Sequence, residues 1–119
     1  MSVTDPRSLL PLTHLTYHVL LALADEDRHG YGIIKEVLAE TDGAMELETG
    51  TLYTALKRLK DDAIIEMVQP NERPPDEDSR RRIYRLSAFG RKVLEAESAR
   101  MAALVGVAAA KRVIPAVSP

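Results

Sequence analysis

The sequence predicts a mainly helical fold with one small β-hairpin and a long helix near its C-terminal end. Three observations lead to this prediction. Apolar residues recur at helical spacing in separate segments between residues 13 and 62. A β-branched run and an arginine-rich run then flank a loop that is rich in proline and acidic residues. A final apolar band continues to about residue 113, farther than a single small domain needs.

The N-terminal part of the chain divides into an arm and two helices. Residues 1–10 are expected to form a flexible arm, because proline discourages regular structure there. Leucine and valine at helical spacing predict a first helix over residues 13–24. A polar break that ends in Gly30 separates it from a second helix, predicted over residues 31–40.

The third predicted helix has one apolar and one polar side. Thr49 is the expected N-cap, and the helix is predicted over residues 50–62. Its leucine and alanine residues fall at the spacing of a single inward stripe. Threonine, lysine and arginine side chains then face outward, and Tyr53 lies at the boundary between the two sides.

Two strands and a loop follow the third helix. Residues 64–69 are rich in β-branched side chains and predict a strand, residues 71–79 a loop, and residues 81–86 the partner strand. Three helices, two strands and a long helix follow one another in the order of a winged helix-turn-helix. In that fold the third helix enters a DNA groove and the hairpin, or wing, lies beside it. The domain is therefore predicted over residues 11–86.

The last helix is predicted to join two copies of the chain. Ser87 is its expected N-cap, residues 87–114 form the dimerisation helix, and residues 115–119 form a tail. Such a helix spans on the order of 40 Å at 1.5 Å per residue, and its apolar band needs a partner to cover it. The expected dimer-interface residues are Val93, Leu94, Glu97, Met101, Leu104, Val105 and Ala108.

Composition argues against several other classes of protein. The chain has 119 residues, 45% of them hydrophobic and 29% charged, as in an ordinary soluble domain. It has no cysteine, which agrees with a cytoplasmic location, and no segment resembles a membrane span. No nucleophile–base pair or glycine-rich phosphate loop is recognisable, so neither an enzyme nor a cofactor is expected. His14 and His18 lack a third ligand, so no metal site is expected.

Short motifs with intact spacing support the winged-helix order. They are His29-Gly-Tyr-Gly-Ile33, Gly50-Thr-Leu-Tyr53, Leu56-Lys-Arg-Leu59, Arg81-Arg-Ile-Tyr-Arg-Leu86 and Ser87-Ala-Phe-Gly90. Over roughly residues 9–104 the chain resembles the compact subgroup of the PadR family of bacterial transcriptional regulators. The resemblance implies a dimeric repressor on a palindromic operator in double-stranded DNA, released in some members by a small apolar or phenolic effector. Two positions depart from the family: Thr54 replaces a common proline, and Ala63 replaces the usual glycine.

Candidate binding residues follow from this reading. The third helix would present its N-terminal residues and outward side chains to DNA, and the arginines at the base of the wing would neutralise phosphates. The expected DNA-binding residues are Lys35, Thr49, Gly50, Thr51, Tyr53, Thr54, Lys57, Arg58, Arg80, Arg81 and Arg82. Met101 and Leu104 are the residues expected at an effector pocket between two copies, although Met101 also suits an ordinary dimer core.

A second function remains open at this point. The formal net charge is −2 and the isoelectric point about 5.9, whereas nucleic-acid-binding domains are often strongly basic. The predicted wing loop also carries acidic residues that phosphates would repel. A winged-helix module that binds another protein, without sequence-specific DNA binding, is therefore the alternative.

Overall fold

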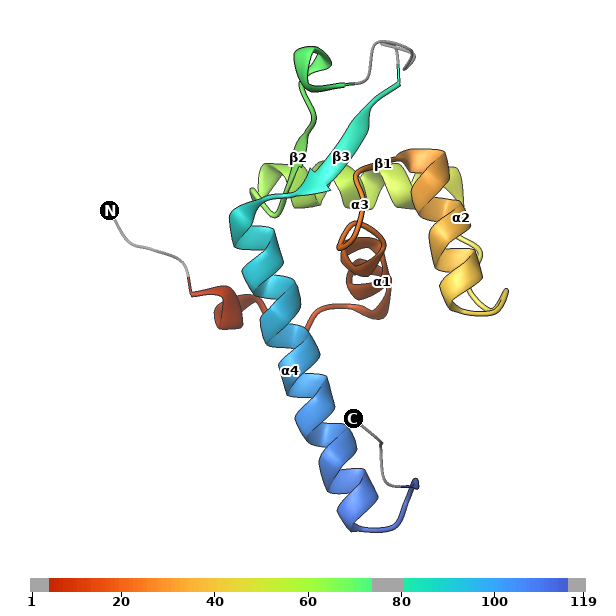
Figure 1. Ribbon diagram of the computed structural model, residues 1–119, viewed down its shortest axis with the longest axis vertical. Helices are drawn as coiled ribbons and strands as arrows, with labels where there is room; N and C mark the ends of the chain where they lie inside the picture. Colours follow the sequence, from red (N-terminus) through yellow and green to blue (C-terminus); the bar gives the residue numbers. More distant parts are fainter. Residues whose placement is uncertain (1–4, 74–80, 116–119) are drawn as a thin grey trace.

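The computed structural model describes residues 5–73 and 81–115. Figure 1 shows a helical body, a small sheet and one helix that projects from the body. In chain order the elements are the short 3-10 helix η1 (Pro6–Leu9), α1 (His14–Ala22), β1 (Arg28–His29), α2 (Gly30–Glu40), α3 (Thr49–Asp61), β2 (Ile65–Met67), the 3-10 helix η2 (Pro70–Glu72), β3 (Ile83–Leu86) and α4 (Ala88–Ala110). This order confirms the predicted fold class, a winged helix-turn-helix followed by a long helix.

The sheet contains one strand that the sequence did not predict. Its three strands are antiparallel in the order β1-β3-β2, so β3 lies in the middle. β2 pairs with β3 as the expected hairpin, with Met67 opposite Tyr84. β1 has only two residues and pairs His29 with Ile83. A strand that short shows no alternation of apolar and polar residues, which explains why it was missed.

The hydrophobic core lies where the first three helices meet the sheet and the start of α4. Leu20, Ile33, Leu52 and Val93, from four different helices, have no exposed surface. The inward stripe predicted for the third helix is confirmed, because Leu52, Ala55, Leu56 and Leu59 are all buried. α3 is therefore fixed in orientation by its apolar side, and its polar side faces outward.

The N-terminal arm is more ordered than expected. Asp5 caps η1 by accepting a hydrogen bond from the backbone N–H of Arg7 at 2.9 Å, and η1 packs against α4. The prediction of a flexible arm is therefore wrong for residues 5–10, whereas residues 1–4 lie outside the described part. Pro6 occupies the first turn of η1, where a missing N–H costs no hydrogen bond.

The first half of α4 is buried by the chain itself. Val93, Leu94 and Glu97 are respectively 0%, 5% and 1% exposed in a single copy. The prediction that these three residues form the dimer interface is therefore wrong, since little of their surface remains for a partner to cover. The Glu97 carboxylate accepts hydrogen bonds from the backbone N–H of Leu12 at 2.8 Å and from Nε of Arg100 at 2.5 Å.

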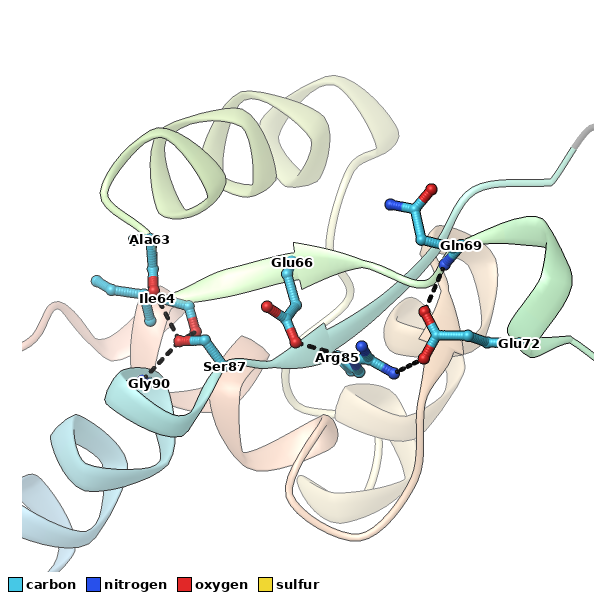
Figure 2. Close-up of polar contacts among 8 residues, drawn as sticks. All are labelled: Ala63, Ile64, Glu66, Gln69, Glu72, Arg85, Ser87 and Gly90. Carbon is cyan, nitrogen blue, oxygen red and sulfur yellow. Dashed lines mark hydrogen bonds and ion pairs between the residues drawn. The ribbon is translucent and has the colours of Figure 1, made fainter.

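One junction connects α3, the wing and α4 (Figure 2). Ala63, at φ 60°, ends α3, and the N–H groups of Ala63 and Ile64 return to the carbonyls of Lys60 and Leu59. The Ser87 hydroxyl lies 2.7 Å from the Ala63 carbonyl oxygen and accepts a hydrogen bond from the Gly90 N–H at 2.9 Å. Ser87 is therefore the N-cap of α4, as predicted.

We expect Ala63→Gly to raise the free energy of unfolding by about 0.5–1 kcal/mol. The left-handed conformation costs a non-glycine residue about 1–2 kcal/mol, and the greater freedom of glycine in the unfolded chain offsets part of the gain. Urea denaturation measures the change. The matched control, Ala39→Gly at an exposed position of α2, should destabilise by about 1 kcal/mol. Equal losses at both positions would contradict the role assigned to Ala63.

We expect the stabilising effect of Glu97 to depend on pH. The Arg100 guanidinium, together with the Leu12 N–H, holds the pKa of the Glu97 carboxyl below its ordinary value, although burial acts in the opposite direction. A lowered pKa in the folded state stabilises the fold above the pKa of the unfolded chain, about 4.3, and the effect is lost as pH falls through the folded value.

Glu97→Gln should therefore lower the free energy of unfolding by about 1–3 kcal/mol at pH 7, and the difference from the wild type should shrink below about pH 4. Urea denaturation across this pH range measures it. Glu95→Gln, at an exposed position of the same helix, is the control and should change little. A difference that stays constant with pH would count against the ionised pair.

Candidate nucleic-acid interface

The outer side of α3 presents hydroxyl groups and positive charges to solvent. Thr51, Tyr53, Thr54, Lys57 and Arg58 are all exposed, as the sequence predicted. The helix begins one residue earlier than predicted: Thr49 is its first residue and Glu48 is its N-cap. Thr49 is therefore not the N-cap. The Glu48 side chain makes no capping hydrogen bond, so it leaves the N–H groups of the first turn to other acceptors.

Two of the outer side chains contact their own helix. The Thr54 hydroxyl donates to the carbonyl of Gly50 at 3.0 Å. The Lys57 ammonium lies 3.3 Å from a carboxylate oxygen of Asp61, and both side chains are more than half exposed. Exposed ion pairs of this kind contribute little to stability, so Lys57 can exchange this partner for another anion at small cost.

The Tyr53 side chain of α3 lies against the start of α2. A β-carbon added at Gly30 would lie 2.4 Å from the Tyr53 hydroxyl oxygen, so the tyrosine occupies the space that any side chain at Gly30 would need. The motif that contains Gly30 was recognised in the sequence, but this contact with α3 was not. Its only sequence signal is the glycine itself, which removes the side chain where two helices approach closely.

His29 brings the start of α2 next to the base of the wing. Its Nδ1 atom accepts a hydrogen bond from the backbone N–H of Gly32 at 2.9 Å and so caps α2. Its Nε2 atom lies 2.9 Å from Nη1 of Arg81. Pairing of β1 with β3 produces this proximity. His29 and Arg81 belong to the lining of an open cleft of about 400 Å³. The residues that line it are His29, Gly30, Tyr31, Tyr53, Arg81 and Arg82.

The arginines of β3 and of the segment before it have different surroundings. Arg81 and Arg82 are exposed, and Arg80 lies outside the described residues. Arg85 instead contacts two carboxylates of the wing, Glu66 at 2.9 Å and Glu72 at 2.7 Å (Figure 2). The hydrogen bond from Arg85 holds the pKa of Glu72 below its ordinary value, and that of Arg85 is raised by the same contact. The charge of Arg85 is therefore balanced within the wing.

Lys35 lies at the same corner of the molecule. It is exposed on α2, and its ammonium group is 5.6 Å from the centre of the Tyr31 ring. Tyr31 in turn stacks beside His29, with ring centres 6.5 Å apart and planes inclined by 17°. The cations Lys35, Arg81 and Arg82 thus gather around the cleft, next to the exposed side of α3.

Residues 5–73 and 81–115 contain neither a membrane-spanning helix nor a metal-binding cluster. None of the described helices has the length and apolar content that crossing a bilayer takes. No group of three or more histidine or acidic side chains in these ranges is placed to hold a metal ion. His14 and His18 make an edge-to-face ring contact at 4.8 Å.

Comparison with known proteins decides the family. The family model described as the transcriptional regulator PadR-like family matches residues 19–96, from α1 into α4. The chain belongs to this family. Among solved structures, a PadR family regulator from Clostridium difficile has 26% sequence identity and a TM-score of 0.65, with 81% of this chain and 95% of that chain covered.

Two further solved PadR structures share the fold. A PadR-like regulator from Bacillus cereus has a TM-score of 0.67 at 16% identity, and the match covers 87% of this chain and 93% of that one. Bacillus subtilis PadR in complex with operator DNA has a TM-score of 0.58 at 21% identity, and the match covers 71% of this chain and 46% of that one.

In this PadR-family chain both departures noted in the sequence have a local structural consequence. Ala63, in place of the usual glycine, adopts positive φ where the end of α3 requires it. Thr54, in place of a common proline, donates to the carbonyl one turn earlier, and its own N–H stays available to the helix. A proline at this position of α3 would lack that N–H.

Proposed function

We propose that the chain is a dimeric, sequence-specific DNA-binding repressor of the PadR type that works in the cytoplasm. One observation carries the proposal: the exposed hydroxyl and cationic side of α3 lies next to the arginines at the base of the wing. A helix that reads base edges and a neighbouring surface that neutralises phosphates are the two parts that a winged-helix DNA contact needs.

α3 would lie in the major groove. Thr51, Thr54, Lys57 and Arg58 face outward from it and would contact base edges or flanking phosphates. The backbone N–H groups of Thr49 and Gly50 and the hydroxyl of Tyr53 would reach phosphate oxygens at the edge of the groove. Lys35, Arg80, Arg81 and Arg82 would supply further phosphate contacts. The Bacillus subtilis relative, solved with operator DNA, supports this use of the fold.

The second half of α4 would form the dimer. In a single copy Leu104 and Val105 are respectively 56% and 40% exposed, and Met101 and Ala108 are half-buried. Figure 1 shows this half of α4 extending away from the helical body. A second copy packed along it would cover the apolar surface, and a two-fold dimer would place two recognition helices on a palindromic operator.

Release from the operator would involve a small apolar or phenolic effector. Met101 and Leu104 lie on the half of α4 that the second copy would cover, and methionine adapts well to the shape of an apolar ligand. An effector that binds one spacing of the two recognition helices better than another would shift the population away from the DNA-binding form.

A protein-binding winged helix is the second candidate. The net charge of −2 favours it, and so does the balance of Arg85 by two acidic residues of the wing. Binding to the upstream duplex, compared with binding to a scrambled duplex, separates the two candidate functions. A protein-binding module has no reason to prefer one duplex over the other.

We expect the wild type to bind the duplex upstream of its own gene more tightly than a scrambled duplex. Arg58→Ala should reduce this preference by about 1–3 kcal/mol, since an arginine on the outer side of α3 can read a base. Arg81→Ala should weaken binding to both duplexes and lower the salt slope by about one. Fluorescence anisotropy at several salt concentrations measures both effects.

The matched control is Arg91→Ala, an exposed arginine on α4 that contacts the Ala24 carbonyl and should leave DNA binding unchanged. Equal binding of the wild type to both duplexes would contradict sequence-specific regulation. Equal effects of all three substitutions would contradict the division of roles between α3 and the wing.

We expect Val105→Glu to convert the dimer into a monomer. Val105 is exposed in the single copy, so the change should spare the fold while placing a charge in the proposed apolar interface. Ala103→Glu is the matched control, because two residues span about 200° of a helix and Ala103 therefore faces the other side. Sedimentation velocity measures the mass. A dimer that survives Val105→Glu, or dissociates only with Ala103→Glu, would overturn this interface.

A further inference from the structure

The hydrogen bonds of His29 determine where its ring carries a proton. The backbone N–H of Gly32 can only donate, and it lies 2.9 Å from Nδ1 of His29. Nδ1 must therefore present its lone pair. A neutral imidazole has one N–H, so the proton lies on Nε2. Protonation of Nδ1 as well would remove the hydrogen bond that caps α2.

This tautomer creates an unfavourable contact with Arg81. Nη1 of Arg81 is 2.9 Å from Nε2 of His29, and a guanidinium group has donors but no acceptor. Two N–H groups therefore face each other at hydrogen-bond distance, and neither can accept. Such a pair becomes favourable when one oxygen atom with several lone pairs lies beside both nitrogens and accepts from each.

The surroundings of this pair favour an anion as that acceptor. The two side chains line the cleft of about 400 Å³ together with Tyr31, Tyr53 and Arg82, and none of its lining residues is acidic. A second hollow adjoins this cleft, and Glu36 of α2 is the acidic residue among those that line it. Its carboxylate already forms an ion pair with Arg28 at 3.0 Å. The cleft thus offers N–H and O–H donors and positive charge without a carboxylate to compete for them.

We propose that His29 and Arg81 form a clamp for a single phosphate of the DNA backbone. Tyr53 belongs to α3 and lines the same cleft. If α3 lies in a DNA groove, the sugar–phosphate backbone of the DNA strand at the edge of that groove would therefore pass beside His29 and Arg81. One phosphate oxygen accepts from Nε2 of His29 and from Nη1 of Arg81, and the contact between two donors becomes two charge-assisted hydrogen bonds. This inference rests on the proposed function and adds to it a contact residue, His29, which is not among the DNA-binding residues expected from the sequence.

His29→Ser is the informative variant. Serine is among the preferred N-cap residues, so its hydroxyl can replace Nδ1 as the acceptor for the Gly32 N–H while the Nε2 donor is lost. Affinity for a mixed-sequence duplex should fall roughly tenfold, the loss expected for one hydrogen bond to a charged group. The salt slope should change less than in Arg81→Ala, because the arginine removed there carries a permanent positive charge. Arg81→Ala should lower affinity and reduce the slope by about one.

A double-mutant cycle tests whether the two residues act on one phosphate. The variant with both substitutions should lose less affinity than the two single losses combined, because either change alone already breaks the shared clamp. His29→Ser paired with Arg91→Ala is the control and should be additive, since Arg91 lies outside the cleft. Thermal unfolding of every variant shows whether the cap of α2 is preserved.

NMR of the His29 ring nitrogens provides a readout that a purely structural role would not affect. The free protein should show the Nε2–H tautomer, and its proton signal should move downfield when the duplex is added. A Nδ1–H tautomer would overturn the clamp, and so would wild-type affinity in His29→Ser or full additivity with Arg81→Ala.

Two further outcomes separate this proposal from the function it depends on. If the wild type binds no duplex, the DNA-binding proposal fails together with the clamp. If the wild type binds DNA and only inorganic phosphate shifts the His29 signal, the DNA-binding proposal stands and the clamp is wrong, because the cleft then holds a free anion.

Discussion

The close approach of Gly90 to the backbone of Ile64 is the constraint on which the rest of the structure depends. A β-carbon at Gly90 would lie 1.9 Å from the Ile64 carbonyl oxygen, a backbone atom that cannot move without shifting β2. The same carbonyl accepts a hydrogen bond from the Ser87 N–H at 3.1 Å. The end of α3, the start of the wing and the start of α4 are therefore in direct contact at Ile64, Ser87 and Gly90. The spacing between α3, the proposed DNA-reading helix, and α4, the proposed dimer helix, is set at this point.

Electrostatic roles in the chain follow from local partners more than from the net charge of −2. Arg28, Arg85 and Arg100 each lie within 3.0 Å of a carboxylate and hold parts of the fold together. Arg81 and Arg82 are exposed beside the cleft at the start of α2, and Arg58 is exposed on α3. A chain that is acidic overall can therefore still present a cationic face to a phosphate backbone.

The sequence predicted those parts of the fold that repeat a pattern. The helices follow from apolar periodicity, and the Ser87 cap follows from a hydroxyl residue at the right place. What could not be predicted depends on contacts between distant segments. Glu97 looked like an interface residue because it shares a helix side with apolar neighbours, but Leu12, 85 residues earlier in the chain, supplies the N–H that helps to bury it. β1 and the approach of His29 to Arg81 are likewise long-range features, and no local spacing announces them.

The candidate site divides in the same way. The outward residues of α3 could be named from periodicity alone, because the buried stripe determines which side remains. The cleft beside them could not, since it needs the pairing of β1 with β3.

The most direct test is a backbone NMR map of the protein with and without its upstream duplex. We expect shifts concentrated at residues 29–35, 49–58 and 81–82, with α4 beyond Met101 unaffected. Shifts confined to another surface, or absent from α3, would contradict it.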